Sequence, residues 1–178
     1  MECNLQVVFS RRKRDSSAPG NGHLTAVLRN RVLDLDPAEA GLDRFSAGHR
    51  VWGALMETGF PTGFATLVSM VDGATSLYLS NGSGMLGEGA NDRVAAATQS
   101  FVTAVEDHLG LLSPDPDSDP PAAGRVIIRA LTYQGRFRAE AALDDLGHGR
   151  HQLSAVFHAG EGVLNELTTI DQARQTGR

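Results

Sequence analysis

The stretch FATLVSMVDGATSLYLS, residues 64–80, decides the fold class. Residues 64–71 are rich in apolar side chains on both faces, which is typical of a central strand. Asp72-Gly73 is the strongest short signal for a hairpin, and the β-rich segment after it predicts an antiparallel partner strand. We therefore expect an antiparallel hairpin near the middle of a sheet.

The segments on either side of this hairpin predict helices and a second hairpin. Apolar residues recur at helical spacing in four segments, namely 23–35, 45–57, 93–109 and a last helix with a stripe from Leu153 to Leu167. Strands are expected at 126–133 and, after a Gln134-Gly135 turn, at 137–143. The fold class is α+β: an antiparallel sheet of about four to five strands flanked by helices, in the order α-α-β-β-α-β-β-α.

Length and composition predict one domain with two tails. A chain of 178 residues has room for one sizeable core. We expect a flexible basic tail at 1–22, a single α+β domain at 23–171 and a disordered tail at 172–178. Four cations of the first tail could give at most weak contact with a membrane surface; they are Arg11, Arg12, Lys13 and Arg14.

The overall charge and the single cysteine exclude several classes of protein. A formal net charge of −5 argues against binding to nucleic acid, and one cysteine allows neither a disulfide framework nor a cysteine-based zinc site. The apolar run at the start of the chain precedes the basic one, the reverse of a secretory signal. We therefore expect a cytoplasmic protein.

Gly82-x-Gly84-x-x-Gly87 matches the pattern of a dinucleotide-binding loop. In such a loop the helix begins inside the motif, so that its free N–H groups face the pyrophosphate. Here Asn91 or Asp92 is the expected N-cap, about five residues too late. The glycines are thus expected to serve a bulge or wide turn. An anion-binding nest that includes Ser83 stays open as the alternative.

Neither a metal site nor a catalytic site has convincing spacing. His148, His151 and His158 could bind zinc as an alternative, although loop histidines more often cap a helix or bind backbone. Asp115, Asp117 and Asp119 resemble the start of a calcium loop, but its required glycine and glutamate are replaced. No catalytic set or cofactor is expected, and the sequence favours a non-enzymatic protein.

The helix expected at 93–109 has no charged residue between Val94 and Val105. A surface helix ordinarily has a charged outer face. We expect a second side of this helix to be covered, either by the N-terminal helices or by another subunit.

The layout resembles the roadblock (dynein light chain) and profilin-like architecture. The resemblance spans residues 45–170: helix 45–57, FATLVSMVDGATSLYLS, helix 93–109, VIIRALTYQGRFRAEAAL and the closing helix. It implies a non-catalytic, homodimeric regulatory or scaffold protein that binds a partner such as a small GTPase. The alternative is a small-ligand or nucleotide-binding protein or enzyme that uses the Gly82–Gly89 turn with the His148/His151 loop.

Overall fold

The structure is a computed structural model that describes residues 21–85 and 91–176. The chain order is α2 (Asn21–Leu33), η1 (Asp43–Phe45), β1 (Val51–Phe60), β2 (Gly63–Met70), β3 (Thr75–Leu79), β4 (Gly84–Met85), α3 (Asp92–Asp107), η3 (Leu109–Leu111), β5 (Ser113–Pro114), β6 (Arg125–Thr132), β7 (Gly135–Ala142), α4 (Leu143–Gly147) and α5 (Ser154–Thr176). These elements form an α+β fold with an antiparallel seven-stranded sheet in the order β4-β3-β2-β1-β6-β7-β5.

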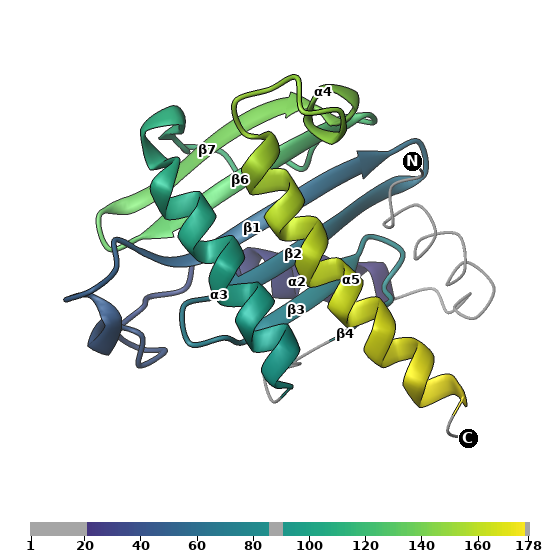
Figure 1. Cartoon of the computed structure of the whole chain (residues 1–178), viewed down its shortest axis with the longest axis horizontal. Coiled ribbons are helices and arrows are strands. Elements are labelled where there is room, and N and C mark those ends of the chain that lie inside the picture. Colours follow the sequence, from purple (N-terminus) through teal and green to yellow (C-terminus); the bar gives the residue numbers. More distant parts are fainter. Residues whose placement is uncertain (1–20, 86–90, 177–178) are drawn as a thin grey trace.

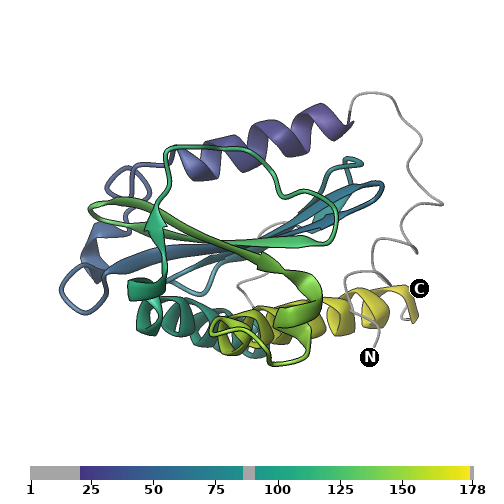
Figure 2. The same ribbon diagram turned by 90° about the horizontal axis from the view of Figure 1, so that it is seen from above.

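The sheet is covered on both faces. Helices α3 and α5 lie side by side on one face, while α2 lies on the other (Figures 1 and 2). The main core forms between the sheet and the α3–α5 pair, and a smaller core that contains Trp52, Leu55 and Leu131 lies under α2. Every residue of β1 is buried, because this central strand has a helical layer on each side.

Several sequence predictions are confirmed. Strands β2 and β3 form the expected antiparallel hairpin across Asp72-Gly73, and β6 and β7 form the second one. Helix α3 begins at the expected cap: the Asn91 side chain accepts hydrogen bonds from the N–H groups of Arg93 and Val94. Local turn and capping chemistry was sufficient to place these elements.

The predicted helix at 45–57 is wrong. Only η1 at Asp43–Phe45 is helical there, and β1 begins at Val51. The apolar residues of 51–60 happen to fit helical spacing, but a strand buried on both faces also has a continuous apolar run, which periodicity alone cannot distinguish from a helix. Four consecutive strands, β1 to the short β4, therefore precede α3, and the predicted count of four to five strands in the whole sheet is too low.

The predicted boundaries at the chain ends also need correction. Helix α2 begins at Asn21, inside the range expected for the tail at 1–22, and α5 continues to Thr176, inside the range 172–178. The cations at positions 11–14 lie outside the described residues. Among the described helices, none is both long and apolar enough to cross a bilayer.

Candidate functional site

The glycines of the dinucleotide-like pattern form a tight hairpin between β3 and β4. Gly82 has φ +92°, and its N–H donates to the Leu79 carbonyl, while the Leu79 N–H donates to the Ser83 carbonyl. A Cβ at Gly84 would collide with the Leu77 carbonyl oxygen, so glycine permits close approach to β3. Helix α3 begins only at Asp92, well after these glycines. Gly87 lies outside the described residues.

The three histidines of the metal alternative have separate roles. His148 Nδ1 lies 2.8 Å from the Asp144 carbonyl, and His158 Nδ1 lies 3.2 Å from Glu161 Oε2. His151 Nδ1 accepts from the Leu153 N–H at 3.1 Å, close to the start of α5. Within residues 21–85 and 91–176, no three His, Cys, Asp or Glu side chains gather as a metal site.

The fold also separates the two parts of the ligand-binding alternative. The Gly82–Gly84 hairpin lies at the β4 edge of the sheet, whereas the His148/His151 loop follows α4, which comes directly after β7 near the opposite edge. Figure 1 shows the two regions far apart. The glycines and histidines do not form one site.

The uncharged part of α3 is only partly covered. Val94, Thr98, Phe101, Val102 and Val105 face the core, and α5 packs alongside. The outer residues Ala96, Gln99, Ser100 and Thr103 remain exposed. Beside them is a hollow of about 280 Å³, lined by Phe45, His49, Val71, Gln99, Val102 and Thr103. Helix α2 lies on the opposite face, so the N-terminal helix does not cover α3 (Figure 2).

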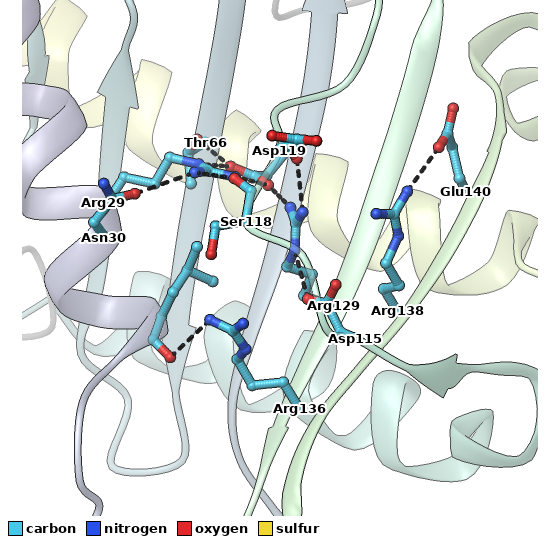
Figure 3. A network of polar contacts seen from close by, with 12 residues as sticks. Arg29, Asn30, Thr66, Asp115, Ser118, Asp119, Arg129, Arg136, Arg138 and Glu140 are labelled. Carbon is cyan, nitrogen blue, oxygen red and sulfur yellow. Dashed lines mark hydrogen bonds and ion pairs between the residues drawn. The ribbon is translucent and has the colours of Figure 1, made fainter.

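A cluster of buried charges joins α2 to the other face of the sheet. Glu57 of β1 accepts from Nε and Nη2 of Arg29, the latter at 2.9 Å, and from the Thr66 hydroxyl at 2.7 Å. It also forms an ion pair with Nη1 of Arg129 on β6. The side chains of Glu57 and Arg129 are fully buried. Figure 3 shows the surrounding network of contacts.

The fourth charge of this cluster comes from the acidic, proline-rich segment 113–124, which we call the strap. Arg129 Nε donates to Asp115 Oδ2 at 2.9 Å, and its Nη2 donates to the Asp119 carbonyl at 2.8 Å. Arg29 Nη1 donates to the Ser118 carbonyl at 2.7 Å. The strap crosses the sheet on the same side as α2 (Figure 2). The buried charge cluster, defined as Arg29, Glu57, Asp115 and Arg129, is electrically neutral.

Burial changes the proton affinities within the buried charge cluster. Desolvation, together with the neighbouring Arg29, Arg138 and Arg136, lowers the pKa of Arg129 to about 9. Desolvation also lowers the pKa of Arg29, although Asp115 opposes this effect. Burial raises the pKa of Asp115 despite the nearby Arg136 and Arg138. All three shifts have the same principal cause, which is removal of a charge from water.

The comparisons give no family for this chain. No protein-family model, curated protein or solved structure matches it. The site must therefore be interpreted from its own chemistry.

That chemistry consists of charge-assisted hydrogen bonds to a segment of polypeptide. In the buried charge cluster each carboxylate is held by guanidinium groups, and the guanidinium groups donate to strap carbonyls and carboxylates, an arrangement that holds backbone in place. Sequence reasoning considered Glu57 only as a general base in principle, without a paired residue, and it missed Arg129. Each is a charge inside an apolar strand run, VWGALMETGF and VIIRAL. Such an interruption is a usable signal, since charged residues are almost never buried without partners.

Proposed function

We propose that the chain is a non-catalytic regulatory or scaffold protein of roadblock-like layout that self-associates through the outer face of α3. The observation that carries this proposal is the exposed, uncharged surface made by Ala96, Gln99, Ser100 and Thr103. Three of these side chains are small, which lets a second helix approach closely, and all four are neutral, which leaves no charge to desolvate in the interface.

The surroundings of this surface favour a second copy of the chain as its occupant. The hollow of about 280 Å³ that borders Gln99 and Thr103 has both apolar and polar residues in its lining, and a side chain from a facing copy can fill it. The surface lies on the middle part of one helix, between Ala96 and Thr103, and a two-fold dimer places the same patch of both subunits in contact. The hairpin, helix, second hairpin and closing helix of the chain support the roadblock-like layout.

Sedimentation equilibrium over a range of protein concentrations tests the proposal. Wild type is expected to dimerise, and Ser100→Arg is expected to weaken the dimer at least about tenfold, because it places an unpaired charge in the interface. Arginine has a higher helix propensity than serine, so the substitution does not weaken α3 itself.

Ala38→Arg is the matched control. It adds the same charge at an exposed position in the loop after α2 and is expected to leave the dimer unchanged. A wild type that stays monomeric at the highest concentration would contradict the proposal, as would equal dimerisation of both variants. A small GTPase, the partner that the roadblock resemblance implies, remains a prediction that direct binding of the purified proteins would test.

A further inference from the structure

We infer that the face of the sheet beneath the strap is a binding site for an extended acidic segment of a partner protein, and that the strap is its intramolecular occupant. The inference concerns the side of the sheet opposite α3, so it goes beyond the proposed self-association. It rests on the charge of this face, on how the strap is held and on the shape of the surface beneath it.

The face beneath the strap is strongly basic. In the register of β6 and β7, Arg129 lies directly opposite Arg138, and Leu131 lies opposite Arg136. Like charges opposite each other destabilise a sheet unless an anion neutralises them. Together with Arg29, this face has five arginines and two glutamates: Arg29, Arg125, Arg129, Arg136, Arg138, Glu57 and Glu140. The three aspartates of the strap balance the excess positive charge.

The strap is held by polar contacts rather than by apolar burial. Residues 116–120 are exposed, and between 113 and 121 only Asp115 and Pro121 are buried. Four of its residues are prolines, which lack an N–H group, so the strap presents mainly acceptors. Guanidinium groups of Arg29 and Arg129 supply the donors. Any extended segment with free carbonyls and a well-placed carboxylate can satisfy the same donors.

The surface beneath the strap is shaped for a polypeptide backbone. A Cβ at Gly59 would overlap the Ala122 carbonyl oxygen and lie 2.8 Å from that of Pro121, so the backbone passes directly over this glycine. The Gly124 N–H donates to the Gly59 carbonyl at 3.0 Å. At the other end of the strap, β5 pairs with the edge strand β7 through Ser113 and Pro114. Addition of an extended chain to a sheet edge is a common mode of peptide recognition.

An exchange of occupants costs less free energy than an empty site does. Removal of the strap without replacement would leave Arg129 with Glu57 as its remaining carboxylate partner and would leave the facing Arg129 and Arg138 without the strap aspartates that balance their charge. A tethered strap competes at an effective concentration of about 1 mM, so a partner must present its acidic segment with additional contacts.

Binding of a labelled strap peptide tests the inference. The probe is a fluorescent synthetic peptide with the sequence LLSPDPDSDPPAAG, residues 111–124, measured by fluorescence polarisation. The receptor is the full chain in which residues 113–123 are replaced by a glycine–serine linker of equal length, so that both β5 and the segment over Gly59 are removed. We expect it to bind the peptide at least about tenfold more tightly than wild type does, because the competing strap is gone.

Two controls separate specific binding from general attraction. A peptide with Asp115→Asn, Asp117→Asn and Asp119→Asn is expected to bind at least about tenfold more weakly, since it lacks the charge-assisted contacts. Gly59→Ala in the linker variant is expected to abolish binding, because its Cβ blocks the path of the backbone. Gly53→Ala is the matched substitution on the same strand. Its neighbours are the side chains of Met70 and Leu131, and it should bind normally.

If the linker variant does not fold, a second receptor tests the same inference. A specific protease site is introduced at the exposed residues 117–118 of the otherwise intact chain, and the folded protein is cut there. Each half of the cut strap stays tethered at one end only, which lowers its advantage over the free peptide, so the cut protein should bind the peptide more tightly than the uncut protein does. A folded receptor of either kind that does not bind the peptide would overturn the inference, and so would equal binding of the asparagine peptide.

Discussion

Substitution of Arg129 by methionine is the most direct test of the buried charge cluster. Methionine keeps much of the volume but removes the guanidinium that contacts both Glu57 and Asp115. Glu57 retains Arg29 and Thr66, whereas Asp115 loses the guanidinium that pairs with it. Loss of one member of a buried ion pair costs about 3–5 kcal/mol. For a chain of this length, that lowers the melting temperature by about 6–20 °C.

The same reasoning predicts a rescue. Asp115→Asn alone is expected to cost about 1 kcal/mol, because it weakens one charge-assisted hydrogen bond. In the Arg129→Met background the same change removes an uncompensated buried charge and is expected to restore about 1–2 kcal/mol. A double-mutant cycle should therefore give a coupling free energy between the two substitutions that is well above about 0.3–0.5 kcal/mol, the usual deviation from additivity for distant sites.

Equilibrium unfolding in urea, followed by tryptophan fluorescence, measures these free energies. Trp52 is the only tryptophan of the chain and is buried in the small core under α2, so its emission reports on this side of the sheet. Arg138→Met is the matched control. Arg138 is a partly exposed neighbour that pairs with Glu140, and its loss should cost less than about 1 kcal/mol. The reasoning is refuted if Arg129→Met costs no more than the control, or if Asp115→Asn has the same effect in both backgrounds.

Three further predictions test the opposite face and the glycines. Desolvation of Glu106 is outweighed by hydrogen bonds from two backbone N–H groups at the start of β1, so the pKa of Glu106 is lowered. The ionised Glu106 carboxylate therefore stabilises the fold above pH 4.5, and this stabilisation is lost as the pH falls through the lowered pKa. Glu106→Gln should therefore be less stable than wild type by about 1 kcal/mol at pH 7, and the difference in urea-unfolding free energy should shrink as the pH falls below 4.5 and through the lowered pKa of Glu106. Gly84→Ala is expected to cost about 1–3 kcal/mol, since its Cβ meets the rigid backbone carbonyl of Leu77. Gly160→Ala should cost less than Gly84→Ala, because its Cβ meets side chains, those of Met56 and Phe101, rather than rigid backbone, and because alanine favours the helix. Thermal unfolding compares the two glycine variants directly, and equal losses would contradict the distinction.

Elements with local signals could be predicted from the sequence, and those defined by their surroundings could not. The β2–β3 hairpin follows from Asp72-Gly73, and the start of α3 follows from Asn91, because turn and cap chemistry acts within a few residues. Strand β1 was missed because its burial on both faces depends on α2, which is distant in sequence. Its identity is a tertiary property.

The buried charge cluster could be predicted only in part, for the same reason. Arg29, Glu57, Asp115 and Arg129 come from α2, β1, the strap and β6, and 28 residues separate even the first two. A charged residue inside an apolar strand run indicates that it needs an oppositely charged or hydrogen-bonding partner. Nothing in the run indicates which segment of the chain supplies that partner. The aspartates of the strap were recognised as an unusual feature; their arginine partners become visible only when the sheet register aligns β6 with β7.

The choice of charges to hold the strap is itself informative. Buried ion pairs seldom stabilise a protein more than well-packed apolar residues of similar volume would, so a strap with a purely structural role would be held more firmly by leucine or valine. This strap instead buries Asp115 and offers its carbonyls to guanidinium groups, while residues 116–120 remain exposed. Another extended acidic segment can make hydrogen bonds and ion pairs of that kind equally well. Apolar side chains packed into a core, in contrast, are replaced only by side chains of the same shape. A face that accepts more than one occupant explains why Arg129 and Glu57 are buried despite the free-energy cost of desolvating them. The peptide-binding experiment tests whether this face accepts a second occupant.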